Sequence, residues 1–195
     1  MSFPIVGIGA SAGGLESISA LLAGIQASTG MAYVFVQHLD PAHGSHLAKI
    51  LSNRTALPVE EAREGEIFPD HLYVIIPNIT LTITSHGLHL RSRDPAERPH
   101  RPVDTLFLSL AEERGPNVIG VILSGSGSDG AKGIQAIKEA GGITFAEEEN
   151  SASFFGMPSS AIQTGGVDFI LAPSDIAQGL VGISRQYYLQ REKTN

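Results

Sequence analysis

A short apolar run near the N-terminus ends abruptly in small residues around one hydroxyl, and no other stretch constrains the fold as much. Val6–Ile8 have the continuous apolar character of a buried strand, and apolar residues recur at helical spacing from Leu15 to Leu22. Between them, Gly9-Ala10-Ser11-Ala12-Gly13 fits the pattern G-x-S-x-G in the strand-to-helix context that this motif requires. Small neighbours let the backbone turn sharply, so that the Ser11 oxygen stands beside the free N–H groups of a helix start. The stretch predicts a turn that can present a nucleophile.

Two other interpretations of this turn stay open from the stretch alone. Dinucleotide-binding folds also begin with a strand followed by glycines, and Asp40, just past the next apolar run, could imitate a ribose ligand. However, Gly7, Gly9 and Gly13 give G-x-G-x-x-x-G, which is one residue longer than the dinucleotide fingerprint. The simplest alternative is a tight turn that contains an ordinary serine.

Length and composition indicate one soluble domain over residues 1–195. Thirteen Lys and Arg against twenty Asp and Glu give a net charge of −7 without a basic cluster, which argues against a nucleic-acid partner. The absence of cysteine excludes disulfides and thiolate chemistry. No apolar run approaches the ~20 residues of a membrane span. We therefore expect an intracellular protein without membrane insertion, most simply in the cytoplasm.

Apolar runs alternate with helical patterns along most of the chain, which predicts an α/β fold with buried parallel strands. Strands are expected at 6–8, 32–36, from 57, and at 118–123, 143–146 and 169–171. Helices are expected at 15–22, from about 45, and at 103–114, 131–140, 158–164 and 175–188.

The middle of the chain departs from this alternation. Leu72–Ile76 and the alternating pair Leu81–Thr84 and Leu88–Leu90 predict antiparallel strands, the last two forming a hairpin. Arg91–Pro102 is charged and rich in proline, so we expect an exposed loop there. The acidic run at 147–149 is interpreted as a solvated loop rather than a cation site.

Three residues with complementary chemistry follow apolar strands at their carboxyl ends. Ser11 follows the first strand, His38 the second, and Asp129 lies in a glycine-rich turn after Leu123. A serine hydroxyl needs an imidazole to accept its proton, and the imidazole needs a carboxylate that fixes its tautomer and stabilises the imidazolium. Carboxyl ends of parallel strands meet at one edge of a sheet. The sequence therefore predicts a Ser11–His38–Asp129 catalytic triad.

Each member of this triad also has a structural interpretation. His38 could simply end its strand, and Asp129 could cap the helix that opens at Gly130. A metal site made of Asp40 and the histidines at 38, 43 and 46 is a further alternative, but the spacing matches no common zinc signature. Asp104 is expected in the first turn of its own helix, where a carboxylate meets free N–H groups.

Five motifs in register resemble one protein family. They are Gly7–Gly14, Val36-Gln37-His38, Val103-Asp104, Leu123–Gly130 and Gly156-Met157-Pro158. In this order they resemble the catalytic domain of the chemotaxis protein-glutamate methylesterase, CheB, over about Phe3 to Ile183. The resemblance implies a doubly wound, mostly parallel sheet, Rossmann-like with three α/β/α layers, together with an antiparallel hairpin. The catalytic residues of the family fall on Ser11, His38 and Asp129.

The resemblance also implies a function. Members of this family hydrolyse glutamate γ-methyl esters on the cytoplasmic helices of chemoreceptors, and many also deamidate receptor glutamines. We expect the same reaction here, without metal or organic cofactor, with the N–H of Ala12 and one from the turn at Ser126 receiving the oxyanion. The rival hypothesis is a signalling module that binds receptor helices or a partner without turnover.

Two departures from the family pattern accompany the resemblance. The family often has threonine after the nucleophile and methionine three residues before the aspartate, where this chain has Ala12 and Ser126. Typical members also begin with a receiver domain, whereas the first strand here is predicted to start at Pro4. We expect a catalytic domain that works without a phosphorylation switch, or one that is joined to or partnered with a receiver or methyltransferase domain.

Overall fold

The computed structural model describes residues 3–25, 28–38, 46–94, 96 and 99–192. Among these residues, seven strands form one sheet in the order β3-β4-β2-β1-β7-β8-β9, and every neighbouring pair is parallel. Their bounds are β1 Ile5–Ala10, β2 Ala32–Gln37, β3 Val59–Glu61, β4 Leu72–Val74, β7 Val118–Ile122, β8 Ile143–Glu147 and β9 Phe169–Leu171.

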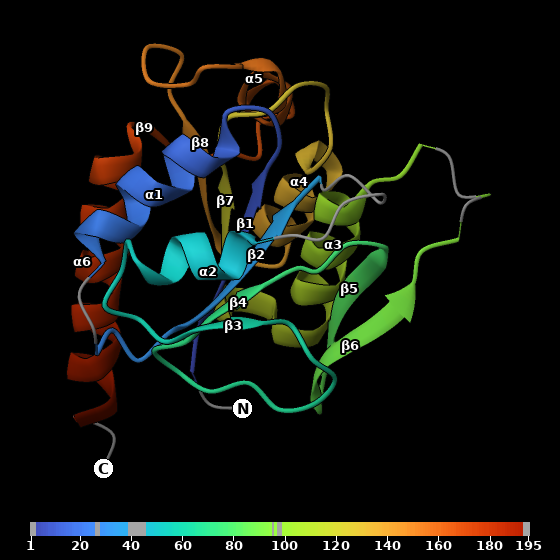
Figure 1. The fold of residues 1–195 in the computed structure, drawn as a ribbon. Helices are drawn as coiled ribbons and strands as arrows, with labels where there is room; N and C mark the ends of the chain where they lie inside the picture. The colour runs from blue at the N-terminus through green and yellow to red at the C-terminus, as the bar shows by residue number, and fades with distance from the viewer. Residues whose placement is uncertain (1–2, 26–27, 39–45, 95, 97–98, 193–195) are drawn as a thin grey trace.

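Helices cover both faces of this sheet, and each face has its own apolar core. Helices α1 Gly14–Gly24, α2 Leu47–Ser52 and α6 Pro173–Glu192 pack on one face, and α3 Pro102–Arg114, α4 Ala131–Glu139 and α5 Gly156–Gln163 on the other. In Figure 1, α1 and α6 lie to the left of the sheet, and α3 and α4 to its right. A short 3₁₀ helix, Gly115–Asn117, joins α3 to β7. The predicted doubly wound, three-layer α/β fold is confirmed.

Two glycines of β1 let helix α3 approach the centre of the sheet. A Cβ built on Gly7 would lie 2.7 Å from Leu110 Cδ1, and one built on Gly9 would lie 2.2 Å from Val103 Cγ1. Neither distance leaves room for a methyl group. The alternation Gly7-x-Gly9 is thus explained by close helix packing and needs no dinucleotide, whereas Asp40, the residue proposed as a ribose ligand, lies outside the described residues.

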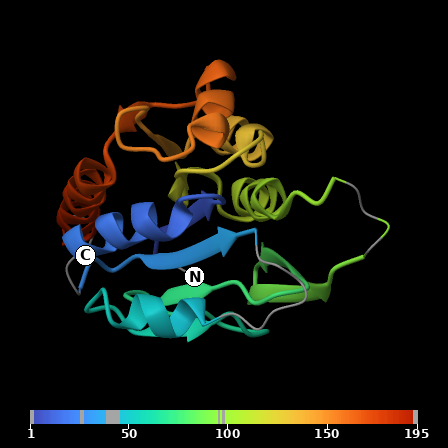
Figure 2. The same cartoon turned by 45° about the horizontal axis from the view of Figure 1, so that its top comes forward.

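The antiparallel hairpin forms a separate pair of strands beside the main sheet. Strands β5 Ile79–Thr84 and β6 Gly87–Ser92 pair in antiparallel register. The hairpin packs against α3, where the Ile83 N–H donates to Ser109 Oγ at 3.0 Å, and both views show it next to that helix (Figure 1 and Figure 2). Since β6 continues to Ser92 and α3 begins at Pro102, the predicted loop at 91–102 is shorter at both ends.

The prediction of an antiparallel strand at Leu72–Ile76 is wrong. Strand β4 pairs in parallel with β2 and with β3, inside the main sheet. Residues 62–71 carry the chain back to the amino end of the sheet after β3, so β4 runs in the same direction as its neighbours. Its three residues are all buried, which fits a strand covered on both faces and contrasts with the alternating pattern of the hairpin.

No helix in the described ranges is both long and apolar enough to span a bilayer.

Candidate active site

The strand order brings the three predicted catalytic residues to one edge of the sheet. Strands β2, β1 and β7 are neighbours, and their carboxyl ends point the same way. Ser11 directly follows β1, His38 directly follows β2, and Asp129 ends the loop that leads from β7 to α4. The strand order also reverses around β1, and such a switch point is where open α/β sheets bind ligands.

A continuous chain of hydrogen bonds joins these three side chains. Ser11 Oγ lies 3.0 Å from His38 Nδ1, and His38 Nε2 lies 2.8 Å from Asp129 Oδ2. A carboxylate only accepts, so Nε2 carries the proton toward Asp129 and Nδ1 is free to accept the Ser11 hydroxyl proton. The two ring nitrogens are thus used the opposite way round from chymotrypsin-like proteases. The His38 side chain is 32 % exposed and that of Asp129 only 5 %, so the serine end faces the surface.

Asp129 is fixed by the helix that precedes it in the chain. Its carboxylate accepts the N–H of Val103 at 3.0 Å and the N–H of Asp104 at 2.9 Å, both in the first turn of α3. It does not cap α4, whose N-cap residue Gly130 makes no side-chain hydrogen bond. Asp129 therefore does cap a helix, but that helix is α3 and not α4, which opens at Gly130.

Asp104 makes the reciprocal contact. Its carboxylate accepts the Gly133 N–H of α4 at 2.9 Å and a hydrogen bond from Arg101 Nη1 at 3.1 Å. Asp104 lies in the first turn of α3, as expected, but the free N–H group that its carboxylate accepts belongs to α4. Together, the two aspartates fasten the starts of α3 and α4 to each other.

The nucleophile turn is tied to the end of β7 through Ser124. The Ser11 N–H donates to the Ser124 carbonyl at 3.0 Å, and Ser124 Oγ donates to the Ala12 carbonyl at 2.8 Å. Gly13 permits this turn because its φ of 73° is in the left-handed region. Among the described residues, the Ala12 N–H has no acceptor, so it is available to a ligand. Ser126, the second residue expected near an oxyanion, is exposed in the β7–α4 turn.

Glu147 corrects the interpretation of 147–149 as a solvated loop. It is the last residue of β8 and only 1 % exposed. Its carboxylate accepts the Ser124 N–H at 2.8 Å and the Ser151 hydroxyl at 3.0 Å. The physical reason is its position, because the end of a central strand faces unpaired N–H groups of the neighbouring turn.

Three supporting residues escaped the sequence analysis: Ser124, Glu147 and, as a side chain, Gln37. Each stands at or just after the carboxyl end of a strand, which is the one signal that could have drawn attention to them.

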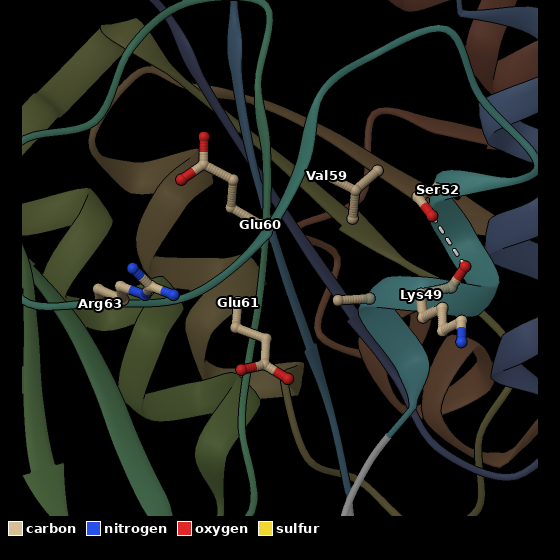
Figure 3. Close-up of a pocket in the computed structure, with 7 residues that line it drawn as sticks. Lys49, Ser52, Val59, Glu60, Glu61 and Arg63 are labelled. Atoms are coloured by element: carbon tan, nitrogen blue, oxygen red, sulfur yellow. Dashed lines mark hydrogen bonds between the residues drawn. The ribbon is translucent and has the colours of Figure 1, made fainter.

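The described residues contain no group of three or more His, Asp or Glu close enough to hold a metal ion. The metal hypothesis also involves positions 40 and 43, which lie outside the described residues. A separate pocket of about 350 Å³ lies between α2 and the edge strand β3, and no triad residue lines it (Figure 3). Its lining carries both signs of charge, with Lys49 and Arg63 beside Glu60 and Glu61.

Comparison with known proteins gives a consistent result. The family described as "CheB methylesterase" matches residues 6–180. A protein-glutamate methylesterase/protein-glutamine glutaminase of Burkholderia pseudomallei (strain 1710b) is 38% identical over 180 residues, 89% of this chain and 49% of that protein. A namesake from Yersinia pestis bv. Antiqua (strain Antiqua) is 37% identical over 182 residues, 91% of this chain and 52% of that protein. The chain thus spans about half the length of these curated relatives.

A solved structure agrees with the sequence relatives. The crystal structure of the Thermotoga maritima CheB methylesterase catalytic domain superposes with a TM-score of 0.87 at 31% identity, covering 94% of this chain and all of that one. Given this likeness, the family match and the site at the edge of the sheet, the chain belongs to the CheB methylesterase family.

Proposed function

We propose that this chain is a serine esterase that hydrolyses γ-methyl esters of protein glutamates, with the cytoplasmic helices of chemoreceptors as its substrates. The observation that carries the proposal is the unbroken chain of hydrogen bonds from Ser11 through His38 to Asp129. Such a chain makes a serine nucleophilic near neutral pH without a metal. The names of the relatives support methylesterase chemistry in particular.

In the acylation step, Ser11 Oγ attacks the ester carbonyl carbon while its proton passes to His38 Nδ1. The negative charge that forms on the carbonyl oxygen faces the Ala12 N–H and a second N–H from the turn at Ser126. The intermediate collapses when the bond from carbon to the methoxy oxygen breaks and Nδ1 returns the proton, so methanol leaves. Ser11 then carries the glutamyl group as an ester.

In the deacylation step, a water molecule gives its proton to His38 Nδ1 and attacks the ester on Ser11. Collapse returns the proton to Ser11 and leaves a free glutamate side chain. Asp129 stabilises the imidazolium in both steps, and the two N–H groups of α3 keep its carboxylate in place. The same steps on a glutamine amide release ammonia, so we include deamidation in the proposal.

Methanol release from methylated chemoreceptor tests the proposal. The wild-type chain is expected to release methanol catalytically, and Ser11→Ala to lose turnover by several orders of magnitude. A free glutamate methyl ester serves as the control for protein recognition. Tight binding of receptor without methanol release would instead support the rival hypothesis of a binding module.

A further inference from the structure

Gln37 lies between β2 and the catalytic histidine, and its side chain reaches the nucleophile turn. Its Nε2 donates to the Ser11 carbonyl oxygen over 3.3 Å. The same oxygen also accepts the Gly14 N–H at 3.0 Å. Two donors therefore converge on one carbonyl, and this carbonyl belongs to the peptide unit between Ser11 and Ala12.

That peptide unit also carries the Ala12 N–H, the donor proposed for the oxyanion. In a planar trans peptide the C=O and N–H bonds point in opposite directions, so whatever fixes the carbonyl also fixes the N–H. Hydrogen bonds to the oxygen also polarise the peptide and make its N–H a stronger donor. Gln37 can therefore act on the oxyanion position without touching substrate.

The oxygen end of the Gln37 amide destabilises the folded protein. Gln37 Oε1 is buried and has no hydrogen-bond partner among the described residues. Exchanging the oxygen and nitrogen of this amide would place one acceptor against another, the Ser11 carbonyl. The contact therefore shows that the nitrogen is the atom that faces Ser11. A buried acceptor without a donor destabilises a folded protein, and such exceptions call for an explanation.

We propose that Gln37 is a positioning residue that orients and polarises the Ala12 N–H for the oxyanion. The inference deepens the proposed function and rests on it. It explains why an amide that is only half satisfied occupies this position. A residue retained for stability would satisfy both ends of its amide or be apolar.

Replacing Gln37 by methionine tests the proposal, because methionine has a similar length and no donor. The first readout is the rate at which a fluorophosphonate labels Ser11, since the phosphoryl oxygen uses the same N–H groups as the ester oxyanion. We expect Gln37→Met to slow labelling by about 10-fold or more. The effect should stay smaller than the loss of about 10²–10³ in kcat that follows when an oxyanion donor is removed outright. On methylated receptor, kcat is expected to fall by a similar factor while KM stays unchanged.

The midpoint of thermal unfolding separates positioning from structural support. Gln37→Met removes the unpaired oxygen while the Ser11 carbonyl keeps the Gly14 N–H, so we expect an unchanged or higher midpoint. Gln37→Glu, which cannot donate when ionised, should slow labelling at least as much. The matched control is Gln135→Met, an exposed glutamine of α4 that bonds Glu139, and it should change neither readout.

Several outcomes would overturn the inference. Labelling of folded Gln37→Met at the wild-type rate would show that the amide does not act on the oxyanion position. A lowered unfolding midpoint or a failure to fold would assign Gln37 a structural role. Wild-type protein that labels at Ser11 but releases no methanol from receptor would refute the proposed function, while the labelling comparison would still decide the role of Gln37.

Discussion

At the scale of single residues, two buried aspartates beside the site make different contacts. Asp129 bonds His38 and the start of α3, whereas Asp104 bonds the start of α4 and does not touch the histidine. Both are nearly inaccessible to solvent. The pair therefore offers a comparison of two carboxylates with similar burial, of which only Asp129 bonds His38.

Asp129→Asn is expected to lower kcat by about 10⁴, because an amide can favour the wrong imidazole tautomer. Asp104→Asn is expected to lower the free energy of unfolding by about 1–3 kcal/mol, for the loss of a buried charged acceptor, and to leave kcat within a few-fold of wild type. Steady-state methanol release and urea unfolding measure the two effects. Equal losses of kcat in both variants would mean that Asp129 acts only by holding α3 and α4 together.

The sequence located the main chemical groups at this scale but not the atoms that support them. Ser11, His38 and Asp129 could be chosen because their functional groups suit one reaction and each follows an apolar run. Their catalytic roles stay predictions. The contacts of Gln37 and Glu147 could not be foreseen, because glutamine and glutamate are common on surfaces and only the packing of neighbouring turns buries them.

At the scale of elements, the segment between β8 and α5 forms one wall of the site. The Gly125 N–H donates to the Phe154 carbonyl at 2.9 Å, and the Phe154 N–H donates to Ser124 Oγ at 3.0 Å. These bonds hold the Phe154 ring beside the nucleophile turn, where a Cβ on Gly13 would lie 3.4 Å from Phe154 Cδ2. Phe154 is still 49 % exposed, so it can contact another molecule.

We expect this ring to contact the substrate protein rather than the ester. Phe154→Ala should raise KM for methylated receptor about 10-fold, since aromatic residues are enriched in protein interfaces and a few residues carry most of the binding energy, and should leave hydrolysis of a free methyl ester unchanged. The matched control is Phe68→Ala, another exposed phenylalanine, which precedes β4 at the amino end of the sheet. A parallel loss on both substrates would mean that the ring shapes the catalytic turn instead.

The contacts of Asp168 predict how the free energy of unfolding depends on pH. Burial alone would raise the pKa of this carboxyl, but hydrogen bonds from Lys138 and Thr144 outweigh it and hold the pKa below its ordinary value of 3.8. Because the pKa of Asp168 is lower in the folded state, its ionised carboxyl stabilises the protein at pH values above 3.8. This contribution disappears as the pH falls through the lowered pKa of the folded state.

Asp168→Asn should therefore cost about 1 kcal/mol in the free energy of unfolding near neutral pH. The difference from wild type should shrink as the solution is acidified below 3.8, the ordinary pKa of the group. Urea unfolding across this range measures it. A difference that stays constant with pH would mean that the charge of Asp168 contributes nothing.

The elements themselves were largely predictable, and the exception is instructive. Continuous apolar runs identified strands of the main sheet, although the edge strand β9 is largely exposed. The alternating pair at Leu81–Thr84 and Leu88–Leu90 identified the hairpin, because period-two patterning reflects one solvated face. The direction of β4 was missed, since strand direction depends on where the connection returns the chain and local pattern carries no such information. The bounds of α1, α3 and α4 differ from expectation by two residues or fewer.

At the scale of the whole molecule, the topology explains why distant residues meet. The chain places β2, β3 and β4 on one side of β1 and then returns to place β7 on the free edge of β1. This return brings Asp129 within reach of His38, 91 residues away in the chain. The glycine face of β1 allows α3 to pack deeply enough for its first N–H groups to bind Asp129. Fold and site are thus consequences of the same packing.

The proposed mechanism requires that Ser11 attacks the ester and carries the acyl group. The most direct measurement is peptide mass spectrometry of protein quenched in acid during hydrolysis of a slowly deacylating ester. We predict an acyl adduct on the peptide that contains Ser11, formed with a burst of alcohol and absent from Ser11→Ala. Continued turnover by folded Ser11→Ala, or an adduct on a different residue, would contradict the account.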